Sequence, residues 1–136
     1  MQSRVRWIVL VVCVGWSATI AGAIVQTEER LVLAPEASGA LLDTGLTITF
    51  ETVVEDSRCP IGVTCVWAGD AVVRIRIDGP KIEARVYTLH TSERSTREIW
   101  HGDVRVRLLA LAPQPTTDGP PRAADYRATL GLQRKN

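Results

Sequence analysis

The sequence has few aromatic side chains, few cysteines and almost no net charge. Aromatic residues make up 5% of the 136 residues, cysteines number three, and 16 lysines and arginines balance 15 aspartates and glutamates to a net charge of +1. A balanced charge gives no attraction to nucleic acid, and so few aromatics offer little for base stacking. The length excludes a two-domain enzyme with a cleft between lobes. Residues 24–136 also lack a helical period, so a helical bundle is not expected.

The longest uncharged stretch lies near the N-terminus. Arg4 and Arg6 precede an apolar run, which ends in the small residues Ala21, Gly22 and Ala23. This order of charged, apolar and small residues is typical of a signal peptide. We therefore expect residues 1–23 to direct export.

Two other fates of this N-terminal segment remain open. Residues 7–25 carry no charge and are long enough to span a bilayer as an uncleaved anchor, which would be the chain's one membrane contact. Cys13 is a poor site for lipidation, because Val12 is larger than the residue that usually precedes a lipidated cysteine. In every case we expect residues 24–136 to form one domain outside the cytoplasm, in the periplasm, at the cell surface or secreted.

Removal of residues 1–23 changes the cysteine count. The mature chain keeps Cys59 and Cys65, with 14 basic and 15 acidic side chains and a net charge of −1. Paired cysteines outside the cytoplasm form a disulfide by default.

Apolar and polar residues alternate in several short segments, which is the pattern of strands with one buried face. These segments are residues 46–51, 73–78, 81–89, 104–109 and 126–132, with a shorter one at 31–33. Within 81–89, we expect Ile82, Ala84 and Val86 to share the buried face. Residues 36–42 have room for one helical turn, and 55–65 and 113–123 are expected to be loops. The fold class predicted is all-β, a small antiparallel sandwich that is immunoglobulin-like or barrel-like.

Residues 55–71 stand apart in composition. They read Asp-Ser-Arg-Cys-Pro at 56–60 and Cys-Val-Trp-Ala-Gly-Asp-Ala at 65–71, with Gly62 between the cysteines. A ring this small stabilises by only about 2–2.5 kcal/mol in the chain-entropy model, so the bridge serves local shape. Asp56 and Ser57 are expected to accept backbone hydrogen bonds, and Gly69 is expected to mark either a bulge or a close approach of backbone. Trp67 is placed to cover the bridge.

This segment resembles the signature of an uncharacterised family of small secreted or lipid-anchored bacterial proteins. Further similarities are an export signal, a Phe-x-x-Val strand, a Leu-x-x-Leu-x-Pro segment and a late tyrosine (Phe50, Val53, Leu108, Leu111, Pro113 and Tyr126). The resemblance covers nearly the whole mature chain. It implies a β-sandwich pinned by a disulfide and implies no activity.

Catalytic and metal-binding patterns are weak. The cysteine spacing is wider than Cys-x-x-Cys and the neighbours are strands, which argues against redox catalysis. The histidines, His90 and His101, belong to no zinc-binding motif, so Asp56 and Asp70 are only weak candidates for a cation site. No Gly-x-Ser-x-Gly motif marks a nucleophile.

We therefore expect a binding or structural module that is not an enzyme, has no cofactor and presents the bridged loop to an unknown protein or small ligand of the cell envelope. The candidate binding residues are Asp56, Arg58, Trp67, Asp70 and Trp100, of which Trp100 either recognises a ligand or covers one end of the core. The alternative is a cation-binding or hydrolytic envelope protein that uses Asp56, Asp70 and a histidine.

Overall fold

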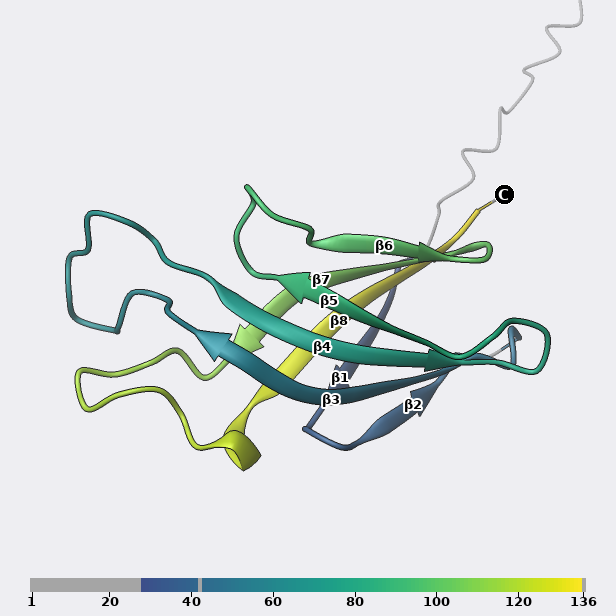
Figure 1. Ribbon diagram of the computed structural model, residues 1–136, viewed down its shortest axis with the longest axis horizontal. Helices are drawn as coiled ribbons and strands as arrows, with labels where there is room; N and C mark the ends of the chain where they lie inside the picture. Colours follow the sequence, from purple (N-terminus) through teal and green to yellow (C-terminus); the bar gives the residue numbers. More distant parts are fainter. Residues whose placement is uncertain (1–27, 42, 136) are drawn as a thin grey trace, which may run out of the picture.

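Alternating apolar and polar residues build two antiparallel four-stranded sheets. The structure is a computed structural model that describes residues 28–41 and 43–135 (Figure 1). One sheet has the order β1-β8-β7-β6, from Glu29–Leu33, Arg127–Arg134, Val104–Ala112 and Glu98–His101. The other has the order β2-β3-β4-β5, from Ser38–Ala40, Thr47–Asp56, Ala71–Asp78 and Arg85–His90. A short 3-10 turn, Ala123–Asp125, precedes β8.

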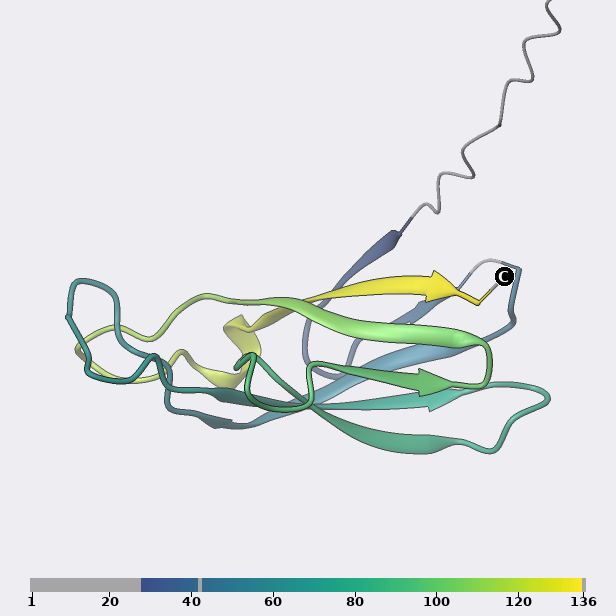
Figure 2. The same cartoon turned by 90° about the horizontal axis from the view of Figure 1, so that it is seen from above.

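The two sheets lie face to face as two layers, and the core fills the space between them (Figure 2). Phe50 of β3 and Ile75 of β4 are fully buried, as are Leu108 of β7 and Leu130 of β8. The remaining members of the core are mostly aliphatic. The predicted all-β sandwich is therefore confirmed, and the separate sheets make it a sandwich rather than a barrel.

Four of the predicted strands have the buried face that their alternation indicated. The fully or nearly buried positions are Leu46, Ile48 and Phe50; Val73, Ile75 and Ile77; Val104, Val106 and Leu108; and Tyr126, Ala128, Leu130 and Leu132. The short first strand is also present, as β1. The export signal, the alternative anchor at 7–25 and Cys13 lie outside the described residues.

The buried face predicted for residues 81–89 is wrong. The strand β5 begins only at Arg85, and Val86 is 51% exposed whereas Leu89 is fully buried. The register explains this, because Leu89 lies opposite Val73 of β4 and directly opposed residues share a face. Ile82 and Ala84 precede the strand and are exposed.

Two short strands were not predicted. The residues expected to hold a helical turn instead contain β2, preceded by Glu36 with a positive φ of 64°. The backbone of Ala37 accepts a hydrogen bond from Phe50, so this segment pairs with β3 instead of coiling. Residues 98–101 form β6, and Trp100 lies within this strand.

The loops gather at two opposite ends of the sandwich (Figure 1). At one end, the 57–70 loop between β3 and β4 lies beside the 113–122 loop between β7 and β8. At the other end lie the 79–84 loop, the tight turn at Gly102 and Asp103, the start of β1 and the end of β8. Among the described residues there is no helix with the length and apolar character needed to cross a membrane.

Candidate functional site

The 57–70 loop is the tip of a long hairpin. Cross-strand hydrogen bonds continue beyond β3 and β4, from Ser57 N to Asp70 O at 2.7 Å and from Cys59 N to Ala68 O at 3.0 Å. Beyond this pair, the predicted disulfide joins Cys59 to Cys65, with their Cα atoms 5.9 Å apart. The bridge therefore closes the tip of the hairpin, which we call the cystine loop (residues 57–70).

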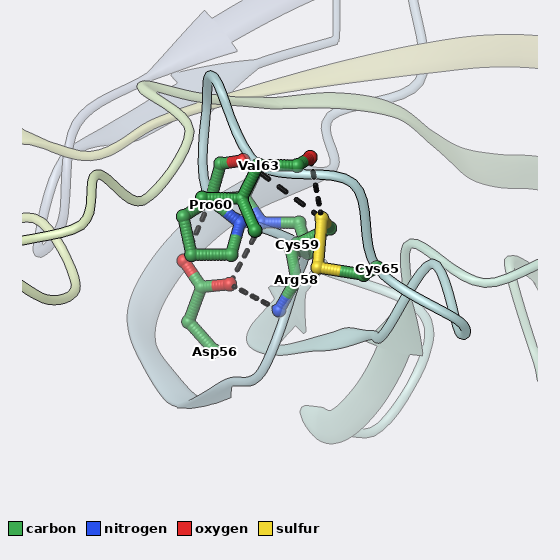
Figure 3. The surroundings of a disulfide bond; sticks show 6 residues. All are labelled: Asp56, Arg58, Cys59, Pro60, Val63 and Cys65. Atoms are coloured by element: carbon green, nitrogen blue, oxygen red, sulfur yellow. Dashed lines mark hydrogen bonds and ion pairs between the residues drawn. A yellow bond between two sulfur atoms is a disulfide. The ribbon is translucent and has the colours of Figure 1, made fainter.

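Asp56 and Arg58 hold the base of the cystine loop through a buried ion pair (Figure 3). Nε and Nη2 of Arg58 donate to the two carboxylate oxygens of Asp56 at 2.8 and 2.6 Å, and the Arg58 backbone N–H adds a bond of 3.2 Å. The side chain of Asp56 is 2% exposed and that of Arg58 is 10% exposed. A two-pronged pair out of water is a strong and directional contact.

The same pair ties the cystine loop to the opposite sheet. Arg58 donates from Nη1 to Leu111 O at 2.5 Å and from Nη2 to Pro113 O at 2.8 Å, both at the end of β7. Tyr126, which precedes β8, donates its hydroxyl to Asp56 at 2.9 Å. Asp56 and Arg58 were predicted as binding residues, but the structure shows their polar atoms engaged within the protein.

Charge and burial act against each other in this network. Burial alone would raise the pKa of Asp56, but the hydrogen bonds from Arg58 and Tyr126 outweigh it, and the pKa lies below its ordinary value of 3.8. Burial and the hydrogen bond to Asp56 raise the pKa of Tyr126 to about 12. The carboxylate is therefore ionised and the phenol neutral throughout the physiological range.

Gly69 lets the two arms of the cystine loop touch. Its φ is +72°, and a Cβ built on it would lie 1.9 Å from the carbonyl oxygen of Ser57. The close backbone approach predicted for Gly69 is confirmed. Ser57 fixes the same contact through its hydroxyl, which donates to Asp70 O at 3.0 Å and accepts from Asp70 N at 3.3 Å.

Asp70 anchors the neighbouring loop that follows β5. Its Oδ1 accepts from Thr91 N, Thr91 Oγ1 and Ser92 N at 3.0, 3.0 and 2.8 Å, and its Oδ2 lies 2.6 Å from Nδ1 of His90. Burial alone would raise the pKa of Asp70. The hydrogen bonds from His90, Ser92 and Thr91 lower the pKa by more than burial raises it, so the pKa lies below its ordinary value. In a hydrolytic triad, too, an aspartate bonds Nδ1 of the histidine and orients its ring.

The tip of the cystine loop exposes apolar side chains. Val66 is 90% exposed and Trp67 is 72% exposed, with Ile61 and Val63 also at the surface. No charged residue occurs from position 59 to position 69. Trp67 is thus a surface side chain, and the expected role as a cover for the bridge is wrong.

An open pocket of about 680 Å³ lies beside Trp67. Polar side chains from three loops line it, Arg58, Ser92, Arg94 and Gln114 among them. Of these loops, the one after β5 is held by Asp70 and the one after β7 by Arg58. Internal hydrogen bonds of Asp70 and Arg58 therefore position the pocket wall.

The structure brings four of the five predicted binding residues to this end and leaves Trp100 elsewhere. Trp100 lies on β6 opposite Arg105 and is half exposed, so it does not cover the core. The sequence analysis missed the pocket residues Arg94 and Gln114 and the pairing of His90 with Asp70. These come from loops distant in sequence, and no local pattern marks them.

Cation ligands do not converge at this site in the part of the chain that is described, because no group of three or more histidine, cysteine, aspartate or glutamate side chains is placed to hold a metal ion. The carboxylates of Asp56 and Asp70 each already accept four hydrogen bonds. A cation would have to displace these donors.

Comparison with known proteins gives no match to a family model, to a curated protein or to a solved structure. The resemblance to the family of small secreted or lipid-anchored bacterial proteins therefore stays a prediction.

Proposed function

We propose that the protein is an exported, non-catalytic binding module whose recognition surface is the cystine loop together with the pocket beside Trp67. The observation that carries this proposal is the pair Val66 and Trp67, which are held 90% and 72% exposed on a loop that is otherwise fixed. Exposed apolar side chains gathered in one place mark interaction sites. A disulfide is typical of proteins outside the cytoplasm, which supports export.

Rigidity of the cystine loop supports the same proposal. The bridge, the Asp56–Arg58 pair and the Ser57–Asp70 bonds all fix the backbone beneath Trp67. A loop that is already ordered loses little conformational entropy when it binds, so more of the contact energy appears as affinity.

The partner is a protein or small ligand that offers apolar surface to Val66 and Trp67 and polar groups to the pocket rim. Arg94 and Gln114 supply donors at that rim. An apolar centre with a polar rim is the usual arrangement of a protein interface. The hydrolytic alternative has one supporting observation, the bond between Asp70 and His90, but no hydroxyl bonded to His90 is found among the described residues.

Site-specific photo-crosslinking tests the proposal. A photoreactive residue replaces Val66. In the matched control it replaces Val86, a valine on β5 that is 51% exposed. In intact cells that export the full chain, we expect a discrete crosslinked species from position 66 and none from position 86. We expect Trp67→Ala to remove that species while changing the free energy of unfolding by less than about 0.5 kcal/mol, because the side chain is at the surface.

Two results would contradict this proposal. One is equal crosslinking from positions 66 and 86, which would indicate collision rather than recognition. The other is a species at position 66 that persists unchanged in Trp67→Ala. The identity of the crosslinked species, by mass spectrometry, then separates a protein partner from a small ligand.

A further inference from the structure

His101 is a buried polar residue that lies at the end of the sandwich opposite the cystine loop. It ends β6 and is 2% exposed. Its Nδ1 is hydrogen-bonded to the hydroxyl of Tyr87 at 2.9 Å, and the two rings meet edge to face with centroids 5.8 Å apart. Its Nε2 is buried with no hydrogen-bond partner. Buried polar atoms without partners are rare in native proteins and call for an explanation.

The surroundings of His101 suit a neutral ring and not a charged one. Burial and the nearby Arg85 lower the pKa of His101 below its ordinary value of 6.5, and the weaker influence of Asp78 opposes them. A protonated ring carries an N–H at both nitrogens, and the N–H at Nε2 would then be a charged donor on a buried atom that has no acceptor. The neutral ring also leaves Nε2 without a partner, but it buries no charge there.

Loop residues form most of the lining of the pocket beside His101. His101 lines a pocket of about 270 Å³ together with Ile82 of the 79–84 loop. The side chain of Ile82 lies against the turn that follows His101, with Cδ1 2.5 Å from the position that a Cβ on Gly102 would take. Ile82 is itself 38% exposed, so it can move without opening the core.

Charges of both signs surround the same pocket. Asp43 and Asp103 line it from two loops, Lys81 lines it from the 79–84 loop, and Arg134 lines it from the end of β8. No ion pair is found for any of these four side chains within residues 28–41 and 43–135. An opened pocket would therefore offer the imidazolium both water and carboxylates.

We propose that His101 is an acid-sensitive switch that opens this end of the sandwich. In the neutral state, Ile82 covers the ring and the 79–84 loop is closed. When His101 takes up a proton, both ring nitrogens carry an N–H and the charged N–H at Nε2 must reach water, so the 79–84 loop moves away from the β6–β7 turn. Because the folded state disfavours the proton, stability is lost as the pH falls below 6.5, and the loss is complete once the pH is below the folded pKa of His101. This switch is independent of the function proposed for the cystine loop.

The experiment uses the fact that the chain has two histidines. NMR titration of the mature protein follows both imidazoles, and hydrogen exchange follows the amides of residues 79–84 and 98–107 at pH 7.5 and pH 5. We expect His101 to titrate below 6.5. After correction for the intrinsic pH dependence of exchange, we expect opening of the two segments to increase several-fold at pH 5.

Three variants make the result decisive. His101→Phe keeps a flat ring of similar size and cannot take up a proton, and His101→Gln serves if the phenylalanine variant does not fold. Both should lose the acid-induced opening. His90→Gln should keep it, because His90 lies at the other end beside Asp70.

Several outcomes would overturn the proposal. These are a His101 pKa at or above 6.5, acid-induced opening that survives in His101→Phe or His101→Gln, and loss of the opening in His90→Gln. Unchanged exchange of residues 79–84 between the two pH values would do so as well.

Discussion

At the scale of single residues, Gly62 and Gly69 show two different reasons why a position requires glycine, a positive φ and a close approach of backbone. Both lie in the cystine loop with positive φ, +72° and +80°. A side chain on Gly69 would strike the backbone of Ser57, whereas nothing lies within 4 Å of a Cβ on Gly62. Gly69 is therefore needed for close approach as well as for its φ.

Alanine at each position measures this difference. Gly62→Ala should cost only the left-handed backbone strain, about 1–2 kcal/mol in the free energy of unfolding. Gly69→Ala should cost at least about 2 kcal/mol more, because backbone must move to admit the methyl group. Urea denaturation of both variants gives the comparison. Equal losses would show that the two arms of the loop are not in contact in solution.

The hydrogen bonds of Asp56 show which contacts of a single residue could be predicted from the sequence and which could not. The sequence correctly indicated that Asp56 accepts a backbone hydrogen bond from a neighbour in a turn, because its donor is Arg58, two residues on. Ser57 also accepts one, but from Asp70 across the hairpin and not from a neighbour in a turn. The sequence could not indicate the bond from Tyr126 to Asp56, which joins residues 70 positions apart. That bond depends on the position of β8 in its sheet, because Tyr126 directly precedes this strand. The order of strands in a sheet cannot be predicted from a short sequence pattern.

At the scale of elements, the hairpin of β3 and β4 divides into a supported body and a free tip. The body packs both strands into the core, while the tip beyond Cys59 is fixed by the bridge, by its own backbone contacts and by a bond of 2.9 Å from Ile61 N to Pro115 O in the 113–122 loop. The bridge should therefore matter more for the tip than for the sandwich.

Replacement of both Cys59 and Cys65 by serine tests this division. The free energy of unfolding should fall by about 2–2.5 kcal/mol, the value expected for a ring of this size in the chain-entropy model. Far-ultraviolet circular dichroism should retain the β-sheet signal, and hydrogen exchange should increase in residues 57–70 alone. Loss of the folded state would mean that the bridge supports the sandwich as a whole.

The strands inside each sheet were predicted better than the strands at its edges. Alternation identified the buried faces of β3, β4, β7 and β8, because each of these strands has neighbours on both sides and one face in the core. At the edges of the two sheets it was correct only for β1. The face of β5 was misassigned, and β2 and β6, with three and four residues, were missed because so few residues give no detectable period.

At the scale of the whole molecule, the bond between Tyr126 and Asp56 joins the two sheets at the cystine-loop end. Its contribution depends on pH, because the raised pKa of Tyr126 means that the folded protein keeps the phenol neutral where the unfolded chain ionises it. Stability from this group is complete below pH 10 and is lost as the pH rises from 10 to about 12.

Tyr126→Phe provides the check. At pH 8 it should lower the free energy of unfolding by about 1.5 kcal/mol, the loss of a hydrogen bond to a charged acceptor. Between pH 10 and 11, the natural protein should lose stability more steeply than the variant. Lysine ionisation contributes equally to both and cancels in the comparison. Parallel profiles would show that Tyr126 is not bonded to Asp56 in solution.

The antiparallel pairing of β1 with β8 has a mechanical consequence. The first residue of β1, Glu29, lies opposite Leu132 near the end of β8, so the chain enters and leaves the sandwich on neighbouring strands at the same end. A force that pulls the two termini apart would load the β1–β8 hydrogen bonds sequentially, starting at the pulled end, and not all at the same time. The sandwich would yield to tension at low force, starting with β1, while the cystine loop at the far end would remain unloaded.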